Sequence, residues 1–219
     1  MLKKKAFTLS EALITIGIIG VVASLTLPDI KQGVDAKSNM AALQKTYSTL
    51  QQATNMAISE HENPIYWDMK DDSTPSINKV YSNYKPYFKM MRECPNEPGC
   101  WGYPTRYLNK TIYWSGHNTD WYQYAFTFTD GVSVLIDIYP ANQLQENFGI
   151  NVNYDAAVFF VDVNSERNPN TIGKDIFAFA VTERGMVPAG MNNTDNCKKN
   201  GIGFQCTAKI IQDGWTIKY

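Results

Sequence analysis

Apolar positions are concentrated near the N-terminus of the chain. Three lysines, Lys3–Lys5, precede a run of 21 residues, Phe7–Leu27, that contains a single charged side chain. A helix of this length, at about 1.5 Å per residue, spans roughly 32 Å, which is close to the thickness of the hydrocarbon core of a bilayer. We therefore expect a transmembrane helix over residues 7–28, with the lysines on the cytoplasmic side of the membrane.

The single charge in this run is Glu11. A carboxylate inside an apolar segment is costly and usually has a partner, so we expect either a cation that neutralises Glu11 or a side chain that extends to the lipid headgroups. Two other kinds of segment share this composition. A secretory signal peptide has a shorter apolar core, and Val22-Ala23-Ser24 is a weak cleavage site for it. A plain membrane anchor fits the length but gives Glu11 no role.

A helical pattern continues beyond Pro28. Apolar residues recur at spacings of three and four, which places them on one helix face. They are Ala36, Met40, Leu43, Tyr47, Leu50, Ala53 or Thr54, and Ala57. We expect residues 40–57 to pack on a globular domain through this face, and Pro28 and Gly33 to bend or locally melt the helix.

The rest of the chain changes character at about residue 110. Residues 58–110 contain six prolines and many Asn, Ser and Asp residues, which predict loops or short helices. Alternating apolar positions then predict strands, and Asp130-Gly131 between the first two is a hairpin signal. The expected elements are strands at Trp121–Thr129, Val132–Tyr139, Ala157–Val163 and Ile176–Val181, and a short helical turn at Thr207–Gln212 before Gly214. The predicted class is α+β, a long N-terminal helix packed on an antiparallel β-sheet.

The charge balance argues against binding to nucleic acid. The chain has 20 Lys and Arg against 21 Asp and Glu, for a formal net charge of −1. Without the three lysines of residues 1–6 the balance falls to 17 basic against 21 acidic residues. A nucleic-acid-binding surface needs clustered basic residues, and the sequence contains neither a basic run nor a basic helix.

The four cysteines form two close pairs in the sequence, Cys94 with Cys100 and Cys197 with Cys206. In an exported domain the expected result is two local disulfides. Free thiols are the main alternative, and a zinc site is the least favoured, because the spacings are not C-x-x-C.

The sequence carries no recognisable catalytic motif: no G-x-S-x-G, H-E-x-x-H, P-loop or G-x-G-x-x-G. We expect no enzymatic activity, although the two carboxylates of a glycosidase would need no motif. Aromatic residues cluster in one part of the chain: Trp101, Tyr103, Tyr107, Tyr113, Trp114, Trp121 and Tyr122. Such residues usually fill a β-rich core. If exposed, they would favour the alternative function of a membrane-anchored surface adhesin or sugar-binding module.

The N-terminal segment resembles that of type IV prepilins and of the pseudopilins of type II secretion. The matching residues are the basic leader Lys3–Lys5, a small residue at Ala6, Phe7-Thr8-Leu9, Glu11 and Pro28. The resemblance implies a leader over residues 1–6, cleavage between Ala6 and Phe7 by a prepilin peptidase, and methylation of the new amine. Ala6 replaces the usual glycine, so we expect slower processing, and Ser10 replaces a usual apolar residue.

The resemblance also implies a location and partners. Before cleavage, the precursor would reside in the inner membrane as a single-pass protein with its N-terminus in the cytoplasm. After cleavage, residues 29–219 would form an exported pilin-like domain in the periplasm or at the cell surface. The partners would be other pilin or pseudopilin subunits, in a filament where Glu11 meets the Phe7 amine of a neighbour. With 219 residues the chain is large for a major subunit, so a minor subunit is an alternative. The Cys197–Cys206 loop is also similar to the disulfide-closed loop of many pilins.

A second resemblance lies in the segment Val161–Asp175. It is similar to the D-x-N-x-x-x-x-P-N-x-x-G-x-D loop of pilin-like domains, and a loop near this place binds calcium in major pseudopilins. Its oxygen donors are Asp162, Asn164, Asn170 and Asp175, which are the kind of ligand that Ca²⁺ prefers. The alternative is a turn held by hydrogen bonds from Asx side chains to the backbone.

Overall fold

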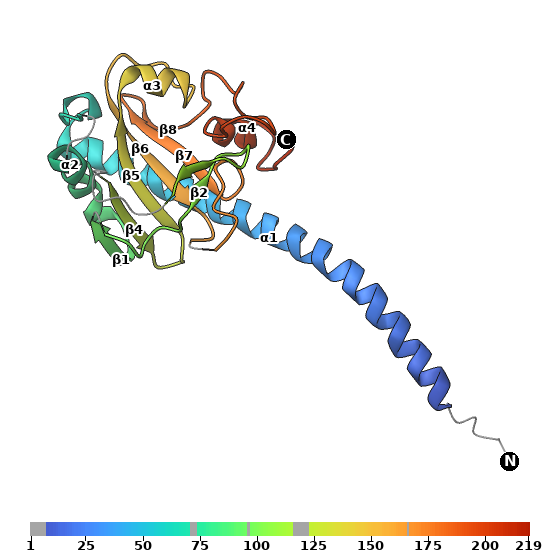
Figure 1. The fold of residues 1–219 in the computed structure, drawn as a ribbon. Coiled ribbons are helices and arrows are strands. Elements are labelled where there is room, and N and C mark those ends of the chain that lie inside the picture. The colour runs from blue at the N-terminus through green and yellow to red at the C-terminus, as the bar shows by residue number, and fades with distance from the viewer. Residues whose placement is uncertain (1–7, 71–73, 96, 116–122, 166) are drawn as a thin grey trace. The chain divides into compact units, whose positions relative to one another are not determined.

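The structure is a computed structural model that describes residues 8–70, 74–95, 97–115, 123–165 and 167–219, with only the backbone of residues 27–34. It divides into two compact units, Met1–Asn39 and Met40–Tyr219. The class is α+β, as predicted, with an apolar N-terminal helix and an antiparallel sheet (Figure 1).

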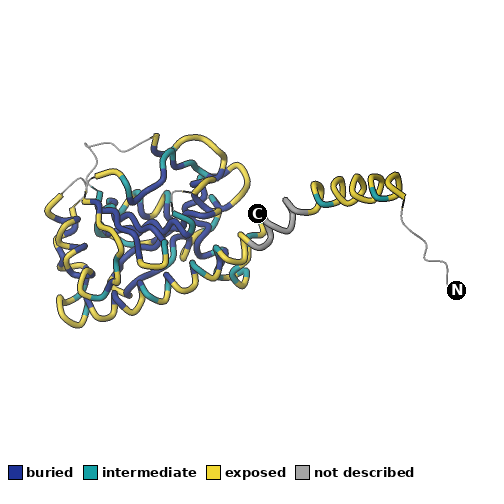
Figure 2. The backbone as a smooth tube through the Cα atoms, turned by 90° about the horizontal axis from the view of Figure 1, so that it is seen from below, coloured by how far each residue is buried: buried dark blue, intermediate teal, exposed yellow. Residues whose placement is uncertain are grey.

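The first unit contains the N-terminal part of helix α1, which runs without interruption over Leu9–His61. The helix continues through Pro28 and Gly33, so the local melting predicted there does not occur. A proline removes one backbone hydrogen bond, and the bonds of the flanking turns are enough to keep the helical conformation. Residues 9–26 are almost all exposed, although most are apolar (Figure 2).

The second unit is built on a six-stranded sheet with the order β1-β4-β5-β6-β7-β8, in which every neighbouring pair is antiparallel. The strands are β1 (Met90–Pro95), β4 (Tyr124–Phe128), β5 (Ser133–Tyr139), β6 (Ala156–Asp162), β7 (Ile176–Thr182) and β8 (Gly185–Pro188). A separate two-stranded ribbon pairs β2 (Thr105–Arg106) with β3 (Ile112–Trp114). The four predicted strands correspond to β4, β5, β6 and β7.

Helices of the second unit supply the remaining core. They are the α1 residues from Met40 onward, α2 (Thr74–Tyr84), α3 (Ala141–Glu146) and α4 (Cys206–Gln212), with short 3-10 helices at Pro64–Tyr66 and Lys85–Tyr87. The predicted apolar stripe is buried at Met40, Leu43, Leu50, Ala53, Thr54 and Ala57. Tyr47 stacks on Phe179 of β7 with ring centroids 5.0 Å apart, so this part of α1 packs on the sheet as predicted.

Both faces of the sheet are covered. Every residue of β6 and β7 is buried, and successive side chains of a strand point to opposite faces. Phe159 lies 4.9 Å from Tyr84 of α2, on the helical face, between ring centroids. Phe160 lies 5.3 Å from Trp114 of β3 and 5.8 Å from Phe204, on the other face. The ribbon and the C-terminal segment therefore form the second cover of the sheet.

The sequence did not indicate every element. Residues 58–110 were expected to contain no strand, yet they supply β1 and β2. Strand β1 lies at the edge of the sheet, with most of its residues exposed or half-buried, so it lacks the apolar alternation that identifies a strand. The Asp130-Gly131 hairpin is confirmed: Gly131 has φ +89° and donates its N–H to the Phe128 carbonyl over 3.0 Å.

Candidate functional site

Glu11 has a partner within its own chain. Thr8 lies directly before α1, and its N–H and Oγ1 donate to Glu11 Oε2 over 2.9 and 2.8 Å. Thr8 Oγ1 accepts in turn from the Glu11 N–H over 3.2 Å. This reciprocal pattern is a capping box, which satisfies backbone donors at the start of a helix. Sequence reasoning missed it, although the spacing T-x-x-E before an apolar run is its known signature.

The apolar part of α1 is exposed along most of its length. Among the described residues, Leu9–Thr26 is the one segment long and apolar enough to cross a membrane, with 18 residues and mean hydropathy 1.9. None of these residues is buried within the chain, and Leu9 and Leu25 are 79 % and 70 % exposed. An exposed apolar surface of this kind is typical of membrane or protein interaction sites. Ala6 and Phe7, the predicted processing residues, lie outside the described residues.

The four predicted calcium ligands come together at the end of the sheet, in the loop between β6 and β7. Asp162 is the last residue of β6, and Asp175 directly precedes β7. Both carboxylates are buried, at 0 % and 1 % exposed, and so is Asn170, at 2 %. Asn164, between them, is half-buried.

Hydrogen bonds join these side chains into one cluster, here called the Asp162 cluster (Asp162, Asn164, Asn170 and Asp175). The Asn164 N–H donates to Asp162 Oδ1 over 3.1 Å, and its Nδ2 donates to Asp175 Oδ2 over 3.2 Å. The Asn170 N–H also donates to Asp175 Oδ2, over 2.9 Å. The Thr171 N–H donates to Asp175 Oδ1 over 2.6 Å. The Asx-turn alternative is therefore present in part, because backbone donors engage both acids.

Three oxygens of the cluster nevertheless lack a hydrogen-bond partner within the described chain: Asp162 Oδ2, Asn164 Oδ1 and Asn170 Oδ1, each of them buried. Burial and the nearby Asp175 charge raise the pKa of Asp162 well above its usual range. Burial also raises the pKa of Asp175, against the hydrogen bonds that favour its charged form. Two buried acids and three unpartnered oxygens make an arrangement that a cation would stabilise.

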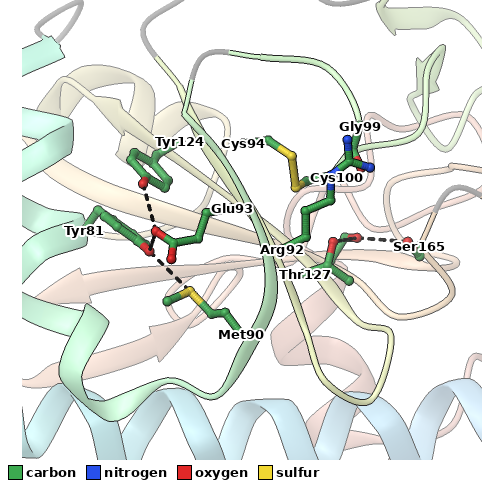
Figure 3. The surroundings of a disulfide bond; sticks show 11 residues. Tyr81, Met90, Arg92, Glu93, Cys94, Gly99, Cys100, Tyr124, Thr127 and Ser165 are labelled. Carbon is green, nitrogen blue, oxygen red and sulfur yellow. Dashed lines mark hydrogen bonds between the residues drawn. A yellow bond between two sulfur atoms is a disulfide. The ribbon is translucent and has the colours of Figure 1, made fainter.

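The structure contains both disulfides that the sequence predicts. Cys94–Cys100 and Cys197–Cys206 have Cα–Cα distances of 5.9 and 4.8 Å, and no free cysteine is described. Figure 3 shows the first bond at the end of β1, where Arg92 donates to the Gly99 carbonyl over 2.8 Å. On the same strand, Glu93 accepts from Tyr81 and Lys85, which hold the pKa of Glu93 below its usual range.

We expect the disulfides to contribute measurably to stability. They close loops of sequence separation 6 and 9. Closing a loop of this size is worth about 2–3 kcal/mol in the chain-entropy description. Replacing Cys197 and Cys206 together by alanine should therefore lower the free energy of unfolding by about 2–3 kcal/mol, measured by denaturant titration. Peptide mapping without reduction should link the local pairs, and crossed links would contradict the assignment.

The aromatic cluster mostly fills the core. Trp101 and Trp114 are 4 % and 2 % exposed. Tyr113 is half-buried, and its ring packs on Tyr107 and Phe204. Trp121 and Tyr122 lie outside the described residues. The described members of the cluster thus offer no exposed aromatic platform for a sugar, and the core interpretation of them is confirmed.

Comparison with protein-family models, with curated proteins and with solved structures finds no match for this chain. Its function is therefore inferred from its own residues and their arrangement.

Proposed function

We propose that the chain is a structural subunit, major or minor, of a type IV pilus or of a type II secretion pseudopilus. The observation that carries the proposal is the exposed apolar segment of α1, which begins with the Thr8–Glu11 capping box. Lipid would cover this segment in the precursor, and neighbouring subunits would cover it in the filament. The T-x-x-E sequence caps the start of the helix at Thr8, two residues after the proposed cleavage site.

The second unit suits a displayed domain. Its sheet is covered on both faces, and the unit contains two disulfides, which are typical of domains in an oxidising compartment. A filament subunit needs no catalytic group, because assembly draws its energy from elsewhere. The adhesin alternative based on exposed aromatics is not supported by a specific observation.

Processing tests this proposal directly. Co-expression with a prepilin peptidase should shorten the chain by six residues and leave a methylated Phe7, as read by intact mass and N-terminal sequencing. Ala6→Gly should be cleaved faster, and Ala6→Leu should remain uncleaved, because the enzyme requires a small residue there. An intact Met1, or a mature N-terminus at Leu25, would contradict the family assignment.

We also infer that the Asp162 cluster holds Ca²⁺. Calcium takes oxygen ligands from carboxylates, amides, backbone carbonyls and water. The two acids and the unpartnered oxygens of Asn164 and Asn170 fit this donor set. The ion would neutralise two buried charges and fix the β6–β7 loop to the sheet.

A further inference from the structure

A hollow at the C-terminal side of the second unit is lined by basic and amide side chains. Its volume is about 540 Å³, and Lys110, Lys174 and Lys199 lie around it together with Asn109 and Asn200. No acidic side chain lines it, and among the described residues none of these lysines forms an ion pair. The chain as a whole has a net charge of −1, so the positive charge of this hollow is a local feature and does not reflect the overall composition.

Three separate segments carry these side chains, and the fold ties them together. Lys110 lies at the tip of the β2–β3 ribbon, Lys174 in the β6–β7 loop, and Lys199 in the loop closed by the Cys197–Cys206 disulfide. The Asn109 N–H donates to the Gly201 carbonyl over 3.0 Å, and the neighbouring Leu108 N–H donates to the Ile202 carbonyl over 3.3 Å. These bonds hold the ribbon tip against the disulfide loop.

The remaining wall is the ring of Tyr219. Its hydroxyl donates to the Gly173 carbonyl, next to Lys174, and its ring packs with Leu108 beside the disulfide. Burial raises the pKa of Tyr219, and the charge of Asp213 raises it further. Asp213 is engaged by Lys209 and Lys218, with N–O distances of 3.4 and 3.9 Å, and it does not line the hollow.

We propose that this hollow binds an anionic saccharide, a sugar that carries sulfate or carboxylate groups. Three like charges held around one space repel each other, and an anion between them converts this repulsion into attraction. The Asn109 Oδ1 already accepts from Thr111, so Asn109 offers its NH₂ group as a donor, and Asn200 offers both a donor and an acceptor for sugar hydroxyls. The Tyr219 ring supplies an apolar face for the C–H side of a sugar. The volume suits a few sugar units rather than a long groove along a nucleic-acid backbone.

The binding surface does not depend on assembly into a filament. It lies entirely within the second unit, Met40–Tyr219, so it can be assayed whether or not the chain is a pilus subunit. The full chain, purified in detergent, would be titrated with four fluorescent ligands. Three are hexasaccharides: a sulfated one from heparin, a carboxylated one from polygalacturonate and a neutral one made of maltose units. The fourth is single-stranded DNA of similar length.

We expect the two anionic saccharides to bind, with affinity that falls as salt is raised, and the neutral one not to bind. Lys110→Gln, Lys174→Gln and Lys199→Gln should each weaken binding about two- to fivefold, the range of an exposed ion pair, and the triple variant more than tenfold. Lys198→Gln is the matched control, because Lys198 is exposed in the same disulfide loop but does not line the hollow. It should leave the affinity unchanged.

Four outcomes would overturn the proposal. They are equal binding of the neutral hexasaccharide, DNA binding as tight as that of the anionic sugars, loss of affinity in Lys198→Gln equal to that in Lys199→Gln, and no binding of any anionic sugar at millimolar concentration. Circular dichroism of each variant would verify that the fold is retained.

Discussion

Replacing Glu11 by glutamine is expected to abolish incorporation into filaments as completely as replacing it by alanine. Glutamine at this helix position can accept the same hydrogen bonds from Thr8, so Glu11→Gln preserves the capping box and removes only the charge. If the carboxylate pairs with the Phe7 amine of a neighbour in an apolar environment, loss of one partner costs about 3–5 kcal/mol, which is more than a hundredfold in association.

Thr8→Ala is the matched control for Glu11→Gln. It removes the Thr8 hydroxyl, which makes two of the three hydrogen bonds of the capping box, but it keeps the charge of Glu11. The cost is about 1 kcal/mol of helix stability, so Thr8→Ala should still enter filaments. The yield of sheared filaments would be measured beside the membrane-bound pool and the mass of the processed chain. Normal filament yield in Glu11→Gln, with a defect in Thr8→Ala, would show that Glu11 acts only as a cap.

The local elements of the fold were predictable because periodicity and turn chemistry act over a few residues. The apolar stripe of residues 40–57 identified the packed part of α1, and Asp130-Gly131 fixed the first hairpin. Strand β1 was not predictable in the same way, since an edge strand is defined by its partner β4 and not by its own pattern. The order of the six strands, which depends on long-range pairing, also carries no local signal.

The candidate sites show the same difference between local signals, which the sequence contains, and tertiary arrangement, which it does not show directly. The donors at Asp162, Asn164, Asn170 and Asp175 were visible as oxygen-rich residues, and the cysteine pairing followed from short spacing. Which oxygens stay unpartnered is decided by the backbone path of the loop, which the sequence does not state. The basic hollow was invisible for a different reason, because its three lysines come from segments that only the tertiary fold brings together.

Asp162→Asn is expected to change stability in opposite directions with and without calcium. Without metal, the substitution removes a buried charge whose pKa is raised by burial and by the Asp175 charge, so the free energy of unfolding should increase. With calcium, the same substitution removes a charged ligand, so stability should decrease.

The pH dependence should reverse in the same way. Because the pKa values of Asp162 and Asp175 are raised in the folded state, the folded chain binds more protons than the unfolded chain. In chelator, these acids should therefore make the domain more stable as pH falls from the raised values toward about 3.9, the unperturbed value for Asp. In calcium, the fall in pH should destabilise the domain, since protons compete with the metal for the carboxylates.

The measurement is thermal melting of residues 34–219, which include the whole second unit, in millimolar Ca²⁺ and in chelator. An ion that binds only the folded state adds about 2.7 kcal/mol at 100 times its dissociation constant. Asp195→Asn is the control for the charge change, because Asp195 is exposed and outside the cluster, and it should shift both melting curves equally. Identical melting of the unmutated domain in calcium and in chelator would exclude the metal and leave the cluster as a hydrogen-bonded turn. A sign reversal confined to Asp162→Asn would instead show that the unpartnered oxygens belong to a cation site.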